Sequence, residues 1–292
     1  MTQPTDLADK GREIEEWIDL RFFRPAGLAL VRAVEPTRIT PDQVTLASLA
    51  MGLVAGHLFW YQSAAVNAVG LALFIVSDIL DSADGQLARR RGTSTHFGRM
   101  LDGVADNLRF LNLYGFLLAR LLVAGGGWPV LLLGGAAGLA HSWQSAAADF
   151  IRLAYQWAVD GRTPDLPDTA AALSRPPRLI ERLYAGYVRR QARLFPTTVR
   201  LIRRGGAPPN SAFAGRYREQ LGPTMRRCAW IGQNIRWALL LSVVAGWPSG
   251  FLWLTAVPLT VVLAMLVRAQ EREARALLES IDAAREDHVR VA

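Results

Sequence analysis

Four aspartates lie in or beside two apolar segments, at spacings that group them into two pairs. Asp81 and Asp84 are three positions apart, and Asp102 and Asp106 are four positions apart. Residues at these spacings share one face of a helix. If the two segments form a helical hairpin, the two pairs meet at its polar end. Because four neighbouring carboxylates cannot all stay ionised without a cation, the spacing predicts a metal site.

The residue types around the pairs indicate which ligands the site takes. Carboxylate oxygens suit Mg²⁺ or Mn²⁺, no Cys/His cluster in the sequence competes for the ion, and two ions ~4 Å apart could share the cage. Gly85 follows the first pair and lets a ligand approach the backbone closely. Arg89, four positions on, can fork onto a phosphate. Together these residues predict a pyrophosphate site at the membrane surface, on a loop between the two pairs.

The elements that carry these residues are predicted to be membrane-spanning helices. The chain is 51% hydrophobic with a mean hydropathy of +0.16, which is too apolar for an ordinary soluble domain. A span takes ~20 residues, and its backbone must satisfy its own hydrogen bonds. We therefore expect an all-α polytopic membrane protein with six transmembrane helices in a bundle. The six apolar segments are residues 43–61, 64–81, 101–123, 128–149, 227–245 and 247–267.

The distribution of basic residues predicts how these helices are oriented. The net charge is +8, and arginine carries nearly all of the positive charge because Lys10 is the single lysine. The arginines concentrate in residues 88–99 and 151–225, and the second range holds thirteen of them. Short cytoplasmic loops favour Lys and Arg. We therefore expect both basic connections and both termini in the cytoplasm, at the inner membrane if the source is bacterial, and no nucleic-acid partner. The polar N-terminus does not have the pattern of a signal peptide.

These patterns divide the chain into five parts. Residues 1–42 are expected to hold an interfacial or cytoplasmic helix, ahead of a helix with Thr40 as N-cap and Pro41 at its first position. Transmembrane helices 1–4 and the aspartates follow in residues 43–150. The remaining parts are a basic cytoplasmic insertion (151–225), helices 5 and 6 (226–269) and a cytoplasmic tail (270–292).

Eight specified positions across the hairpin form one longer motif. The chain reads Asp81-x-x-Asp84-Gly85-x-x-Ala88-Arg89, then eight residues, then Gly98-x-x-x-Asp102-x-x-x-Asp106. This motif resembles the signature of the CDP-alcohol phosphotransferase (CDP-alcohol phosphatidyltransferase) family, class I, with every fixed position present. The stretch TPDQVT at residues 40–45 also looks like the family's first-helix start, with Asp42 where asparagine is usual. The insertion at residues 151–225 is longer than a minimal member of the family needs.

The resemblance implies an enzyme that transfers a substituted phosphate group from a CDP-alcohol, often CDP-diacylglycerol, to the hydroxyl of a polar acceptor, with release of CMP. By position, Asp81, Asp84 and Asp102 would bind the metal ions. Asp106 would act as general base on the acceptor hydroxyl and as a further metal ligand. The nucleotide and its phosphates would be contacted by Gly85, Ala88, Arg89, Thr95, Gly98 and Pro41. The resemblance also implies a homodimer surrounded by membrane lipids.

A fifth aspartate, Asp78, lies one turn deeper than the first pair and outside the motif. A carboxylate within a span is costly and is usually paired. Asp78 is therefore expected either to pair with Arg109 or Arg120, or to shape the pocket of the acceptor alcohol. Arg109, Asp149 and Arg152 are further candidates for that pocket, since arginines suit a phosphorylated acceptor such as inositol phosphate or glycerol phosphate. Asp149 and Arg152 could equally pair with each other.

Three other functions are compatible with parts of the pattern. A choline- or ethanolamine-type phosphotransferase would use a CDP-base and a lipid acceptor. A membrane prenyltransferase also uses aspartate-rich motifs and a diphosphate, but its two motifs normally lie far apart in the chain. An ion or proton transporter uses intramembrane carboxylates, but these aspartates cluster at one helix-end level, and Gly85 and Arg89 then have no role. CMP release separates the phosphotransferases from the other two.

Overall fold

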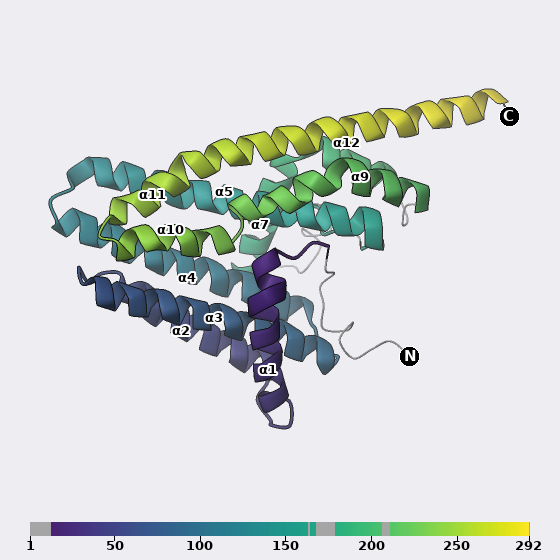
Figure 1. Cartoon of the computed structure of the whole chain (residues 1–292). Helices are drawn as coiled ribbons and strands as arrows, with labels where there is room; N and C mark the ends of the chain where they lie inside the picture. The colour runs from purple at the N-terminus through teal and green to yellow at the C-terminus, as the bar shows by residue number, and fades with distance from the viewer. Residues whose placement is uncertain (1–12, 163, 168–178, 206–210, 292) are drawn as a thin grey trace. The chain divides into compact units, whose positions relative to one another are not determined.

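The computed structural model describes residues 13–162, 164–167, 179–205 and 211–291, and most of these residues lie in helices (Figure 1). These residues include no strand, which confirms the all-α prediction. The chain divides into two units. The first comprises residues 1–139 and 234–257, and the second comprises residues 140–233 and 258–292. The division falls within the long helix α5 (Gly127–Asp160).

Three long helices form the centre of the first unit. The helix α2 (Pro41–Leu58) packs against both α3 (Ala64–Arg90) and α4 (His96–Val123). Ahead of them come a short π-helical turn, η1 (Asp19–Phe23), and α1 (Arg24–Val34), which runs across α3 (Figure 1). The helices α10 (Asn234–Val244) and α11 (Pro248–Ala256) complete this unit and contact α3 and α4, respectively.

The ends of α2 and α3 follow from local sequence. Thr40 accepts a hydrogen bond from the Gln43 backbone N–H (3.2 Å), and the Gln43 side chain accepts one from the Thr40 N–H (2.9 Å). This capping box, with Pro41 at the first helical position, confirms the predicted helix start. The helix α3 ends at Arg90 and is followed by Gly92, whose φ of +65° favours glycine. The N–H of Thr93 returns to the carbonyl of Ala88 at 2.9 Å, as in a Schellman motif.

Aromatic rings fill the core of the first unit. Phe74 of α3 lies with its ring centroid 6.4 Å from that of Phe110 on α4 and 5.3 Å from that of Trp237 on α10. Phe59, at the end of α2, approaches Phe74 at 6.2 Å. These buried rings connect α3 to α4, and α2 packs against both helices, so that the polar ends of α3 and α4 lie near each other.

The second unit contains the insertion. It consists of the C-terminal part of α5, then α7 (Leu179–Leu194), α8 (Pro196–Gly205), α9 (Ser211–Arg227), a 3-10 turn η2 (Cys228–Ile231) and α12 (Pro258–Val291). The helix α8 is capped by Glu271 of α12, which accepts hydrogen bonds from the N–H groups of Thr197 (2.7 Å) and Thr198 (2.9 Å). The described part of the insertion is therefore largely helical, and it packs on α12.

Several helices differ from the predicted spans. The segment predicted at residues 227–245 is not one helix, because Gly232 is extended (ψ −172°) and separates η2 from α10. With 11 residues, α10 is about 17 Å long, which is shorter than the ~30 Å hydrocarbon layer. The segment predicted at residues 247–267 is interrupted at Val257 because proline follows at Pro258. Among the described residues, two helical stretches, Ala64–Arg90 and Pro248–Ala283, are long and apolar enough to cross a membrane. The count of six spans therefore stays a prediction.

Candidate active site

Three of the four motif aspartates gather at the polar end of α3 and α4. Asp81 comes from α3, and Asp102 and Asp106 come from α4. One carboxylate oxygen from each lies within 4.8 Å of the others, and all three side chains are half-buried. The cluster arises because the interhelical connection is short and because i, i+4 spacing on α4 turns both of its aspartates toward α3. Three convergent oxygens within this distance fit the ligand set of a hard divalent cation.

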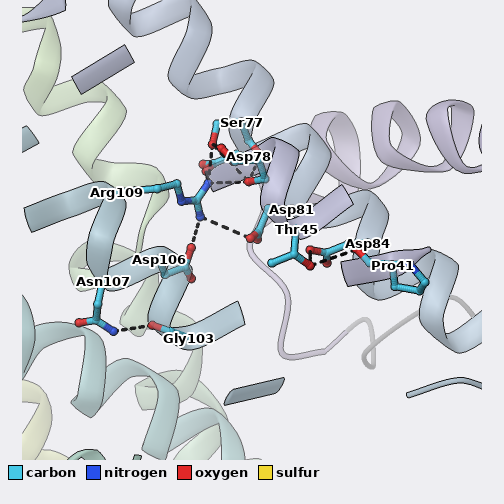
Figure 2. A network of polar contacts seen from close by, with 11 residues as sticks. Pro41, Thr45, Ser77, Asp78, Asp81, Asp84, Gly103, Asp106, Asn107 and Arg109 are labelled. Atoms are coloured by element: carbon cyan, nitrogen blue, oxygen red, sulfur yellow. Dashed lines mark hydrogen bonds and ion pairs between the residues drawn. The ribbon is translucent and has the colours of Figure 1, made fainter. Parts of the chain in front are cut away.

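The fourth motif aspartate, Asp84, lies apart from this group of three. Its position on α3 is about 60° around the helix from that of Asp81, and it faces α2. There the buried Asp84 carboxylate accepts a hydrogen bond of 2.5 Å from the Thr45 hydroxyl, which also lies 3.2 Å from the carbonyl of Pro41 (Figure 2). Metal binding by Asp84 stays a prediction, and the structure adds a contact with α2 that the motif does not reveal.

Arg109 of α4 occupies the centre of the polar network (Figure 2). Its side chain is 1% exposed. The guanidinium donates to Asp78 at 3.1 Å and to Asp81 at 3.4 Å, and it forms an ion pair with Asp106. It also donates to the hydroxyls of Ser77 (2.7 Å) and Ser48 (3.2 Å). The predicted pairing of Asp78 with Arg109 is thus confirmed, and Arg109 also contacts two of the motif carboxylates.

Small residues on α2 make room for this arginine. A Cβ atom on Gly52 would lie 2.5 Å from Cδ and 2.7 Å from Cγ of Arg109. One turn away, Ser48 donates to the carbonyl of Ser77 (2.9 Å), and Ser77 donates to the carbonyl of Ser48 (2.8 Å). This reciprocal pair holds α2 and α3 close together. Sequence reasoning missed Ser48, Gly52 and Ser77, although small and polar residues one turn apart in an apolar helix indicate close helix contact.

The predicted phosphate loop is in fact helical at its first residues. Gly85 and Arg89 lie in the last turns of α3, and the connection to α4 is limited to residues 91–95. A Cβ atom at Gly85 would lie 3.2 Å from Nη1 of Arg89, so glycine leaves space for the guanidinium along the helix. Ala88 lies in the same turns. The prediction of a loop was wrong because α3 continues to Arg90 before Gly92 ends it.

The other predicted nucleotide contacts lie at helix N-termini. Thr95 is the N-cap of α4 and accepts a hydrogen bond of 2.9 Å from the N–H of Gly98. A Cβ atom at Gly98 would lie 3.9 Å from a carboxylate oxygen of Asp42, so the first turns of α4 and α2 are neighbours. Pro41 is the first residue of α2. Free backbone N–H groups at such helix starts favour anions, although whether these residues contact a nucleotide stays a prediction.

Arginines next to the motif hold the connection between α1 and α2. Arg91 donates through Nη2 to the carbonyls of Glu35 (3.0 Å) and Thr37 (3.1 Å), and through Nη1 to that of Ile39 (2.5 Å). Arg90 forms an ion pair of 3.2 Å with Glu35. Sequence reasoning treated these arginines only as cytoplasmic positive charges. Their contacts fasten the residues that lead into Pro41.

Two residues predicted for the acceptor pocket belong to the second unit. Asp149 of α5 accepts hydrogen bonds from Gln191 (3.0 Å) and from the hydroxyl of Tyr187 (3.3 Å), both on α7. Burial raises the pKa of Tyr187 well above its usual value of 10.0, and the negative charge of Asp149 raises it further. Arg152 lies one turn beyond Asp149 on α5. Membership of Asp149 and Arg152 in one pocket with Asp78 and Arg109 stays a prediction.

Residues 38–163 match the family model of the CDP-alcohol phosphatidyltransferases. This range includes the whole of α2, α3, α4 and α5, and therefore every motif residue. The match lies on the residues that carry the motif, and it confirms the resemblance to this family.

Individual relatives from three organisms align with part of the chain. The phosphatidylinositol phosphate synthase of Mycolicibacterium smegmatis is 34% identical over 96 residues, which are 30% of this chain and 37% of that protein. The CDP-diacylglycerol–glycerol-3-phosphate 3-phosphatidyltransferase of Rickettsia bellii is 37% identical over 68 residues (23% and 38%). The archaetidylinositol phosphate synthase of Pyrococcus horikoshii is 35% identical over 85 residues (29% and 44%). The chain spans roughly two fifths of the length of these relatives.

Proposed function

We propose that this protein is a divalent-metal-dependent CDP-alcohol phosphotransferase of phospholipid synthesis. It transfers a phosphatidyl group from a CDP-alcohol, with CDP-diacylglycerol as the favoured donor, to the hydroxyl of a polar acceptor and releases CMP. The observation that carries the proposal is the gathering of Asp81, Asp102 and Asp106 within a domain of this family. The names of the three relatives, which include two inositol phosphate lipid synthases and one glycerol-3-phosphate transferase, support this reaction class.

The carboxylates fit Mg²⁺ or Mn²⁺ because they supply only oxygen atoms from convergent directions. We assign the ion-binding role to Asp81, Asp102 and Asp106, with Asp84 as the fourth ligand and two ions as the expected number. When bound, the ions neutralise the pyrophosphate and the negative charge that develops on the departing CMP. Gly85 and Arg89 contact the donor's phosphates, and Ala88, Thr95, Gly98 and Pro41 surround the nucleotide.

Asp106 removes the proton from the acceptor hydroxyl. Arg109 donates to Oδ1 of Asp106, and we assign the proton to the other carboxylate oxygen. The acceptor oxygen then forms a bond to the phosphorus of the phosphatidyl group, while the bond from that phosphorus to the oxygen of CMP breaks. A carboxylate needs only hydrogen-bond reach to the hydroxyl for this role.

We also propose that the acceptor carries a phosphate. The basis is the arginine content around the site, together with the relatives whose names include inositol phosphate and glycerol-3-phosphate. Asp78, Arg109, Asp149 and Arg152 stay our candidates for the acceptor pocket.

The protein is integral to the membrane through six spans, with the site and both termini on the cytoplasmic side, and it acts as a homodimer. Support comes from the apolar stretches, the basic connections and the family.

A CMP-release assay tests the proposed function. Purified protein receives CDP-diacylglycerol, Mg²⁺ or Mn²⁺ and one acceptor at a time, namely inositol phosphate, glycerol phosphate, inositol or serine. We expect CMP release with a phosphorylated acceptor. CMP release only with CDP-choline or CDP-ethanolamine plus diacylglycerol would instead assign a choline- or ethanolamine-type enzyme. Absence of CMP under all of these conditions would contradict the phosphotransferase assignment and would favour an ion or proton transporter.

A further inference from the structure

Asp78 and Arg109 form a buried ion pair that lies outside the family motif. The carboxylate and the guanidinium are 3.1 Å apart, and the side chains are 8% and 1% exposed, respectively. A buried charge that loses its partner is strongly unfavourable. The two residues therefore depend on each other, and Arg109 also contacts the motif carboxylates Asp81 and Asp106, which suggests a role beyond the stability of the helix bundle.

The two ends of the Arg109 guanidinium have different partners. Nη1 is held by Asp78, by the Ser77 hydroxyl at 2.7 Å and by the Ser48 hydroxyl at 3.2 Å. Nη2 points the opposite way, to Asp81 at 3.4 Å and to Asp106 (Figure 2). Because the guanidinium is planar and rigid, fixing Nη1 also fixes the position of Nη2. Asp78 thereby determines where the positive charge of Arg109 lies between the two motif carboxylates.

We propose that Arg109 is a positioning residue that acts as a built-in counter-charge competing with the divalent cation for Asp81 and Asp106. This inference rests on the proposed function, because it takes the motif carboxylates as metal ligands. In the metal-free protein, Nη2 neutralises Asp81 and Asp106 and keeps them near each other. When a cation binds these carboxylates, Asp78 and the two serines retain Arg109. Arg109 thus lowers the metal affinity of the site and preserves its geometry without metal, whereas Asp78 limits this competition by sharing the positive charge of Arg109.

A purely structural role for the pair predicts a different result. If Arg109 only held the helices together, its loss would loosen the carboxylate cluster and would weaken metal binding or leave it unchanged. If Arg109 competes with the cation, its loss removes a positive charge from the ligands and tightens metal binding. Removal of the Asp78 charge should act in the opposite direction, because Arg109 then shares its charge with fewer carboxylates and holds Asp81 and Asp106 more strongly.

The test measures Mn²⁺ binding to the full-length protein in detergent without nucleotide, from the electron paramagnetic resonance signal of free Mn²⁺. We expect Arg109→Gln to tighten Mn²⁺ binding about tenfold, which is the lower end of effects for residues that contact metal ligands. We expect Asp78→Asn to weaken it by a similar factor. Arg120→Gln is the matched control: this arginine is also buried on α4, but it donates to the carbonyl of Phe59 at 3.2 Å and should leave Mn²⁺ affinity unchanged.

The double variant Asp78→Asn/Arg109→Gln covers the case in which Arg109→Gln alone does not fold, because it removes both buried charges. It should bind Mn²⁺ more tightly than Asp78→Asn alone. The proposal would be overturned if Arg109→Gln bound Mn²⁺ no more tightly than the wild type and the double variant bound it no more tightly than Asp78→Asn. The assay involves no CDP-alcohol, so it is independent of CMP release. If the wild type releases CMP but the Mn²⁺ affinities of the variants do not follow the expected order, only the role of Arg109 is refuted. If the wild type binds Mn²⁺ but releases no CMP, only the proposed reaction is refuted.

Discussion

Thr45 of α2 donates a hydrogen bond of 2.5 Å to Asp84 of α3, across 39 positions of sequence. Both side chains are buried, at 6% exposure each. This bond ties the first turn of α2, which also carries Pro41, to the first half of the motif. The position of one motif carboxylate therefore depends on a residue that the motif does not contain.

Thr45→Val should separate this contact from simple packing. Valine keeps the shape of threonine but leaves the buried Asp84 carboxylate without its hydroxyl donor, which costs about 1–3 kcal/mol. We expect a lower unfolding temperature and a fall in CMP release of about tenfold if Asp84 is a metal ligand that Thr45 orients. Thr45→Ser, which retains the hydroxyl, is the control. Equal activity in the two variants would show that the bond does not orient Asp84.

Asp106→Asn should nearly abolish transfer, because asparagine cannot accept the proton of the acceptor hydroxyl. General bases contribute about 10²- to 10⁴-fold to rates, and we expect a loss in this range. Binding of the CDP-lipid with metal, measured by equilibrium titration, should persist. Asn107→Ala is the matched control, since Asn107 is exposed and donates to the backbone carbonyl of Gly103 (2.6 Å) on its own helix. Activity of Asp106→Asn within a few-fold of wild type would remove Asp106 from the role of base.

Removal of divalent metal should stop turnover. EDTA is expected to eliminate CMP release, and added Mg²⁺ or Mn²⁺ should restore it, because Asp81, Asp102 and Asp106 offer only carboxylate oxygens. The same ions should raise the unfolding temperature of the substrate-free protein, since a ligand that binds the folded state stabilises it. Full turnover in protein stripped of metal would exclude the metal assignment.

Gly52→Ala should disturb the Arg109 network without changing any charged residue. The new Cβ would lie 2.5 Å from Cδ of Arg109, and overpacking of this kind costs about 1–3 kcal/mol. We expect lower thermal stability and slower CMP release. Gly115→Ala on α4 is the control, because a Cβ there meets no atom within 4 Å and alanine favours a helix by about 1 kcal/mol over glycine. If the two variants behaved alike, close packing at Gly52 would not support the site.

The sequence was sufficient to predict the helical class, the start of α2 and the aspartate motif, because these depend on local features. Capping residues act within one turn, and the i, i+3 and i, i+4 spacings follow from helix geometry alone. The motif also carried the family resemblance that the match over residues 38–163 confirms. Two local predictions were wrong. Gly85 and Arg89 were expected in a loop but lie in α3, because glycine within a helix is tolerated when neighbouring residues favour the helix. The segment at residues 227–245 was expected to be one helix but is divided by the extended Gly232.

Only the tertiary structure decided which carboxylates gather and what lies between them. The rotation of α3 against its neighbours turns Asp84 toward Thr45 and leaves Asp81 facing α4, and no spacing rule contains that rotation. The choice of Arg109 over Arg120 as partner of Asp78 likewise depends on depth in the bundle and on the space that Gly52 leaves. Local sequence determines which side chains share a helix face. Packing between faces, which depends on residues distant in the chain, determines which of those side chains meet.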